Sequence, residues 1–174
     1  RLQRLAEEFG QSPWLDNLRR DWLQSGELGR WVERGVRGVT SNPSIFQKAF
    51  TATDAYDEQF AALVGAGRSV TDAYWDLVVD DIVRALALLE PVHTASSGED
   101  GHVSVEVAPA LARDTDGTLT AARELHARID RPNLYVKIPG TTEGLPAVSQ
   151  ATAEGINVNV TLLFSLSRYS EVIE

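Results

Sequence analysis

Cysteine and methionine are both absent from the 174 residues. The first absence excludes certain kinds of bond and metal site, and the second concerns the start of the chain. Without cysteine there can be no disulfide and no thiolate metal site. Because methionine is missing even at position 1, we expect the chain to begin inside a longer one. No apolar run approaches the ~20 residues of a membrane-spanning helix. The first residues, Arg-Leu-Gln-Arg, do not resemble the start of a signal peptide, so we expect no membrane partner.

Positive charge is also scarce. The chain has 16 lysines and arginines against 25 acidic residues, which gives a net charge of −9. This balance argues against a broad surface for nucleic acid or anionic membrane, so no nucleic-acid partner is expected. A phosphorylated substrate is compatible with it, because such a substrate needs only a local positive pocket. The three histidines, His93, His102 and His126, lack the spacing of metal ligands, and we expect no metal.

Lysine occurs only twice, as Lys48 and Lys137. Lys137 lies in the apolar run Leu-Tyr-Val-Lys-Ile, which ends at a Pro-Gly turn. Burial favours the neutral amine of a lysine, and the neutral amine can attack a carbonyl to form a Schiff base. The alternative is a structural lysine on an edge strand, or one whose stem reaches out to water. The motif alone favours the structural alternative, so the rest of the chain has to decide.

Apolar periodicity and turn signals predict an alternation of strands and helices. A capping box at Ser69–Asp72 opens a long helix that we expect to stop at Pro91, and Ser165 caps the last helix. Alternation of this kind indicates parallel βαβ units. We expect a short helix over 1–10 and strands near 12–17, 37–42, 102–108, 133–138 and 156–162.

The two faces of the strands distinguish a barrel from an open sheet. Val103, Val105 and Val107 share one face of their strand, and Ser104 and Glu106 share the other. An open parallel sheet covered on both sides should be apolar on both faces. We therefore predict a (β/α)8 TIM barrel whose polar strand faces line the lumen. The chain would be the N-terminal part of that single domain, covering about five βα units, with at least three more to follow.

In this phase each predicted strand carries polar residues near its C-terminal end, where barrel enzymes place catalytic groups. A buried polar group without a partner costs about 1–3 kcal/mol, so packing alone does not explain the coincidence. The residues are Asp16, Asn42, Glu106, Lys137, Asn159 and Thr161.

Three segments that contain these residues resemble signature sequences of the transaldolase family. The similarity runs from about residue 12 to the last residue, in order and in spacing. The strand at 105–109 and the turn at 138–141 are most similar to the longer bacterial branch of the family. The three segments are 38–46 (Gly-Val-Thr-Ser-Asn-Pro-Ser-Ile-Phe), 136–139 (Val-Lys-Ile-Pro) and 155–164 (Gly-Ile-Asn-Val-Asn-Val-Thr-Leu-Leu-Phe).

The resemblance implies a class I aldolase mechanism without metal or other cofactor. Lys137 matches the Schiff-base nucleophile, and Asp16 matches the carboxylate that accepts the donor's hydroxyl proton during cleavage. Glu106 matches the acid/base, which works through a water held with Thr161. Carboxylates in a low-dielectric lumen suit proton transfer, which agrees with these roles. The substrate-binding positions are Asn42, Asn159 and Thr40.

The implied reaction moves a dihydroxyacetone unit from sedoheptulose 7-phosphate to glyceraldehyde 3-phosphate, in the cytoplasmic pentose phosphate pathway. The first alternative is a fructose 6-phosphate-type aldolase of the same superfamily, and the second is a non-catalytic barrel fragment. A monomer and a homodimer are both compatible with the sequence. Ser41 stands where many members have threonine. The strands that usually supply the phosphate-binding arginine would lie beyond Glu174.

Other motifs indicate structure instead of chemistry. The Asp114–Thr118 segment matches the aspartate box of haloacid-dehalogenase-type phosphatases, but no apolar strand precedes it, and we expect a helix-capping loop. The Gly65–Gly67 segment follows a helix and lacks a third glycine, so it is not a dinucleotide-binding turn. Arg19 and Arg20 are interpreted as part of a solvated helix face.

Overall fold

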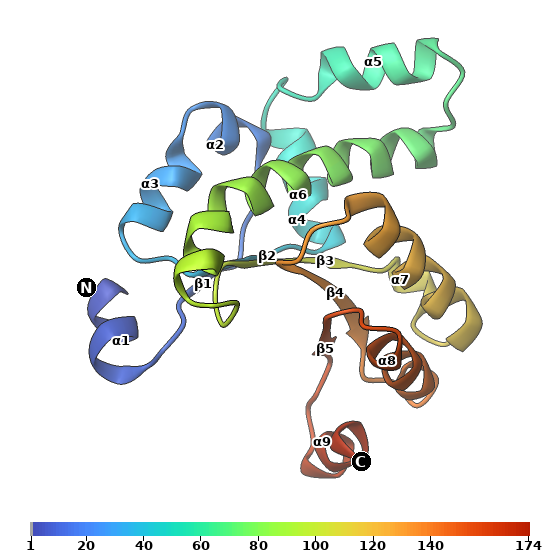
Figure 1. Ribbon diagram of the computed structural model, residues 1–174. Helices are drawn as coiled ribbons and strands as arrows, with labels where there is room; N and C mark the ends of the chain where they lie inside the picture. The colour runs from blue at the N-terminus through green and yellow to red at the C-terminus, as the bar shows by residue number, and fades with distance from the viewer. Residues whose placement is uncertain (1) are drawn as a thin grey trace. The chain divides into compact units, whose positions relative to one another are not determined.

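A computed structural model describes residues 2–174, in which five strands alternate with helices (Figure 1). The strands follow chain order in the sheet, β1-β2-β3-β4-β5, and the pairs β1/β2 and β4/β5 are parallel. The predicted α/β class is thereby confirmed, in an arrangement consistent with part of a (β/α)8 barrel. The chain divides into two compact units, Arg1–Val103 and Ser104–Glu174, and β3 (His102–Glu106) crosses the boundary.

The N-terminal unit contains two short parallel strands and six helices among its described residues. β1 pairs with β2 in the register Trp14 to Gly38, and a Cβ at position 38 would collide with the Trp14 indole. Glycine therefore lets the two strands approach closely. The predicted helix over 1–10 is α1, although Arg1 lies outside the described residues. The elements are α1 (Leu2–Phe9), β1 (Trp14–Leu15), α2 (Arg20–Gln24), α3 (Glu27–Glu33), β2 (Gly38–Thr40), α4 (Pro43–Ala52), α5 (Asp57–Gly65) and α6 (Val70–Ala95).

The long helix α6 begins as expected and ends later than expected. The Ser69 side chain accepts a hydrogen bond from the Asp72 N–H at 3.1 Å, which confirms the predicted cap. The prediction that Pro91 ends the helix is wrong, because α6 continues to Ala95. Two contacts hold the extra turn: the Ser96 N–H donates to the Val92 carbonyl at 3.0 Å, and His93 Nδ1 donates to the Asp100 carbonyl at 2.9 Å. Local pairing thus offsets the hydrogen bond that proline cannot make.

Arg20 is buried, with 3% of its surface exposed, so its assignment to a solvated face is wrong. Its Nε donates to Asp81 Oδ1 at 2.8 Å, and its guanidinium lies 4.5 Å from the centre of the Tyr56 ring. The Tyr56 hydroxyl donates to Asp81 Oδ2 at 2.8 Å and accepts from the Arg20 N–H. Burial raises the pKa of the Asp81 carboxyl, although the hydrogen bond from Arg20 favours its ionised form. The network joins α2 to α6 and to Tyr56, which precedes α5.

We expect Arg20→Met to lower the free energy of unfolding by about 3–5 kcal/mol, because Asp81 would then be a buried charge without its cation. Urea denaturation of the full-length protein measures this. Arg4→Gln, which removes an exposed pair with Glu8, is the control and should leave the midpoint almost unchanged. The double variant Arg20→Met/Asp81→Leu should be less destabilised than Arg20→Met alone. An Arg20→Met protein as stable as the Arg4→Gln protein would contradict the interpretation.

The C-terminal unit contains the end of β3 and two further strands with their helices. α7 and α8 pack against each other and against β4. Asp114 accepts a hydrogen bond from the Gly117 N–H at 2.9 Å, so the segment that resembles a phosphatase motif is the expected helix cap. Ser165 likewise caps α9, accepting from the Arg168 N–H at 3.1 Å. The elements are a 3-10 turn (Pro109–Leu111), α7 (Thr115–Ile129), β4 (Leu134–Pro139), α8 (Gly144–Ala153), β5 (Val158–Thr161) and α9 (Leu166–Ile173).

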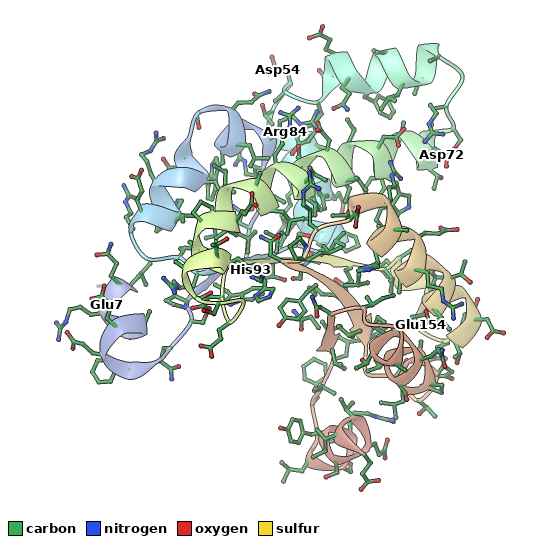
Figure 2. All side chains as sticks on the ribbon, viewed as in Figure 1. Glu7, Asp54, Asp72, Arg84, His93 and Glu154 are labelled. Atoms are coloured by element: carbon green, nitrogen blue, oxygen red, sulfur yellow. The ribbon has the colours of Figure 1, made fainter. Side chains whose placement is uncertain are left out.

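An ion pair fastens α7 to the end of α8. Arg123 donates from Nε to Glu154 Oε2 at 2.7 Å, and Gln150 donates to the same carboxylate. These hydrogen bonds, Arg123 first, lower the pKa of Glu154 to about 2. Figure 2 shows Glu154 among the side chains of these helices.

Within the described residues, no helix is both long enough and apolar enough to cross a bilayer.

Candidate active site

The C-terminal unit brings together two of the residues predicted to do chemistry. Lys137 is on β4, with 8% of its surface exposed, between the fully buried Val136 and Ile138. Its Nζ lies 3.5 Å from Oε2 of Glu106, the last residue of β3. The two side chains therefore project to the same side of neighbouring strands. An amine and a carboxylate in contact provide a nucleophile and a proton carrier within reach of one bound carbonyl compound.

β5 adds two further predicted residues beside the lysine. Asn159 stands opposite Lys137 in the parallel register, and Thr161 stands opposite Pro139. Because side chains alternate along a strand, Asn159 and Thr161 share one face of β5. Thr161 Oγ1 is buried and makes no hydrogen bond to any described residue. A buried hydroxyl without a hydrogen-bond partner lowers the stability of the fold. An unpaired hydroxyl of this kind is typical of a position that binds a ligand.

The backbone that follows each of these two strands is constrained. Leu162 follows Thr161 with φ of 63°, a left-handed conformation that is costly for a branched side chain. After β4, the Gly140 N–H donates to the Thr161 carbonyl at 2.7 Å. The Thr141 hydroxyl donates to the Ala112 carbonyl and accepts from the Gly144 N–H at 2.9 Å. The Gly140 bond joins the ends of β4 and β5, and the Thr141 bonds fix the turn that follows Lys137.

Thr141 is a supporting residue that the sequence reasoning did not identify. Its hydroxyl reaches the carbonyl of a residue 29 positions earlier, a contact that no local pattern reveals. Gly144 is tied to the same turn, because a Cβ there would collide with the Pro139 carbonyl. The Pro-Gly-Thr sequence after the lysine was the available signal, since such residues mark a turn of fixed geometry.

Three predicted residues belong to the N-terminal unit. Asp16 is exposed and directly follows β1, and Thr40 is the last residue of β2. Asn42 lies outside the strand, contrary to the predicted range of 37–42, and is the N-cap of α4: its Oδ1 accepts from the Ile45 N–H at 2.9 Å. Ser41, between the last two, is fully buried. That these residues join Lys137 in one site stays a prediction.

The side chains around Lys137 determine which chemistry the candidate site can perform. Within residues 2–174 no group of three or more histidine and acidic side chains is placed to hold a metal ion. His93 and His102 stack edge-to-face at 4.9 Å, with burial lowering the pKa of His102, and they contribute no ligand cluster. The C-terminal unit does offer a buried amine, a carboxylate, an amide and a hydroxyl on three strands. This set suits covalent catalysis on a carbonyl.

The chain is similar to known proteins along almost its whole length. The family model described as transaldolase/fructose-6-phosphate aldolase matches residues 13–174. Transaldolase 2 of Nostoc punctiforme is 51% identical over 164 residues, which are 94% of this chain and 43% of that protein. Transaldolases of Thermobifida fusca and Mycobacterium leprae are each 51% identical, over 99% and 95% of this chain. The chain spans less than half the length of these relatives, at 47% and 44% for the last two.

Proposed function

This chain belongs to the transaldolase/fructose-6-phosphate aldolase family, and on that premise we propose that it is the Schiff-base-forming part of a transaldolase. The observation that carries the proposal is the contact of Lys137 Nζ with Glu106, at 3.5 Å on neighbouring strands. The names of the similar proteins favour transaldolase over the aldolase, which the family description also includes. The substrates would be ketose and aldose phosphates.

In the proposed mechanism, Lys137 attacks the ketose carbonyl and Glu106 supplies and removes protons as water leaves the carbinolamine. Thr161 would hold the water through which Glu106 acts, which would give its unpaired Oγ1 a partner. Asp16 would take the hydroxyl proton when the carbon–carbon bond breaks. The enamine left on Lys137 then attacks an aldose phosphate. Asn42, Asn159 and Thr40 would bind the three-carbon unit.

We also propose that the 174 residues are the N-terminal part of one (β/α)8 barrel domain. Large apolar side chains around α9 support this: Phe164 is 89% exposed, Leu166 86% and Ile173 68%. Apolar surface of this extent is typical of a face that packs against further structure. The cytoplasmic location, and a monomeric or homodimeric state, are carried over from the resemblance as parts of the same proposal.

Borohydride trapping tests the proposal. We expect the full-length protein, incubated with fructose 6-phosphate and borohydride, to gain one reduced three-carbon unit on Lys137, because borohydride converts the imine into a stable secondary amine. Peptide mass mapping distinguishes Lys137 from Lys48, which is exposed on α4. Label on Lys48, or no label on an active protein, would overturn the mechanism.

A second arm of this experiment separates the two activities of the family. The enzyme is given fructose 6-phosphate with or without erythrose 4-phosphate, and free dihydroxyacetone is measured. A transaldolase should release almost none without the aldose and should form sedoheptulose 7-phosphate with it. Rapid release of dihydroxyacetone into water alone would assign the chain to the aldolase instead.

A further inference from the structure

A half-open apolar cavity of about 340 Å³ lies in the N-terminal unit, where α4, α5 and α6 meet. Its volume is at the small end of the range of roughly 300–1,000 Å³ for small-molecule sites. None of the residues assigned above to carbonyl chemistry lines it. Its apolar walls consist of Phe50, Tyr56, Phe60, Val70, Tyr74 and Leu77.

Three of the four aromatic residues that line the cavity hold one another in place. Phe50 stands edge-on to Tyr56, with ring centres 4.5 Å apart, and to Tyr74, with centres 5.7 Å apart. The Tyr56 hydroxyl is already bonded to Asp81 and to the Arg20 N–H. Tyr56 therefore presents only its ring to the cavity. A site with walls fixed in this way loses little conformational freedom when a ligand enters.

One charged residue lines the cavity, and it is acidic. Asp57, in the first turn of α5, is exposed, and its carboxylate makes no ion pair or hydrogen bond within residues 2–174. Glu58 follows it in the same turn. Arg68, in the connection between α5 and α6, is already engaged by both carboxylate oxygens of Asp76, at 2.9 and 3.0 Å. Figure 2 shows two more acidic side chains, Asp54 and Asp72, at opposite ends of this helix pair.

Aromatic faces and a carboxylate attract the same kind of group. The face of an aromatic ring is electronegative and binds cations within about 6 Å. The Arg20 guanidinium already uses the Tyr56 ring in this way, at 4.5 Å. An ammonium group at the mouth would meet Asp57, while an apolar body would occupy the space among the rings. A carboxylate or phosphate would face Asp57 without a cation to compensate.

We propose that this cavity is a binding site for a small organic cation, an ammonium group carried on an aryl or alkyl body. Its ammonium would pair with Asp57, and its body would contact Phe60 and Tyr74. The site is separate from the proposed lysine chemistry and does not depend on it.

Three probes that share a phenylethyl body and differ in charge test the proposal on the full-length protein. They are 2-phenylethylammonium, neutral 2-phenylethanol and the anion 3-phenylpropionate, and titration is followed by NMR chemical shifts of the lining residues. The ammonium probe should bind about 5-fold or more tightly than the alcohol, the gain typical of a weakly shielded cation–π and charge contact, and the anion should bind most weakly. Failure of all three to shift Phe60 or Tyr74, or equal affinities, would overturn the proposal.

Two variants locate the interaction. Asp57→Asn should remove most of the preference for the ammonium probe over the alcohol. It should leave the alcohol's own affinity unchanged, which also shows that the cavity is intact. Glu58→Gln removes a neighbouring charge that does not line the cavity, and should keep most of the preference for the ammonium probe. If Asp57→Asn keeps the full preference, or if Glu58→Gln abolishes it, the assignment to Asp57 is wrong.

Discussion

Replacing Lys137 by arginine is expected to abolish transfer of the three-carbon unit in the full-length enzyme. A guanidinium stays protonated at all relevant pH values and cannot form an imine. Arginine also keeps the positive charge that faces Glu106, 3.5 Å from the lysine nitrogen, so the ion pair and the fold should persist. The measurement is turnover of fructose 6-phosphate with erythrose 4-phosphate, combined with borohydride trapping on the same preparation.

The matched control for this change is Lys48→Arg. Lys48 is the other lysine of the chain and lies exposed on α4. Its replacement should leave both turnover and trapping at the level of the parent. If Lys137→Arg retains measurable transfer above the uncatalysed rate, a nucleophile other than Lys137 must carry the reaction. An equal loss in both variants would indicate an unspecific effect of the substitutions.

Glu106→Gln should lower the rate by roughly 10²–10⁴, the usual contribution of a general acid/base. Glutamine has nearly the shape of glutamate, and it can still accept a hydrogen bond from Lys137 through its carbonyl. It cannot carry a proton to or from the carbinolamine. Stopped-flow trapping should show slow imine formation together with a thermal midpoint close to that of the parent.

Glu124→Gln supplies the comparison for this second change, because Glu124 is exposed on α7 in the same unit. It should have no effect on the rate. Retention of more than half the activity by Glu106→Gln would make Glu106 a structural partner of Lys137. A normal rate of imine formation with slow carbon–carbon cleavage would instead move the role of Glu106 to a later step.

Features of the fold that depend on nearby residues could be predicted from the sequence. Ser69, Asp114 and Ser165 each cap the helix that their side chain begins, because the donor N–H lies only three residues away. The alternation of polar and apolar residues along β3 and β4 could be interpreted for the same reason. Side chains alternate along a strand, so the phase indicated a shared face for Glu106 and Lys137 before any distance was known.

Features that depend on distant partners could not be predicted. Arg20 looks like a surface residue in its own helix, and its burial is explained by distant partners such as Asp81, 61 positions later. Two of the predicted strands were also too long. β1 covers only Trp14–Leu15, and the strand expected to reach residue 42 ends at Thr40. The reason in the second case is Asn42, whose side chain begins a helix and thereby takes its backbone out of the strand.

The cap formed by Asn42 also dictates which atoms that side chain can recognise. The Asn42 carbonyl oxygen accepts a hydrogen bond from the Ile45 N–H. The two hydrogens of the Asn42 amide nitrogen remain available to a ligand. A group that binds to the amide nitrogen must present a lone pair, so a hydroxyl there would turn its oxygen toward Asn42 and its hydrogen elsewhere. Aspartate would keep the helix start but reverse this polarity. In the proposed site, the hydrogen bond that begins α4 would thus favour one orientation of a ligand's hydroxyl group.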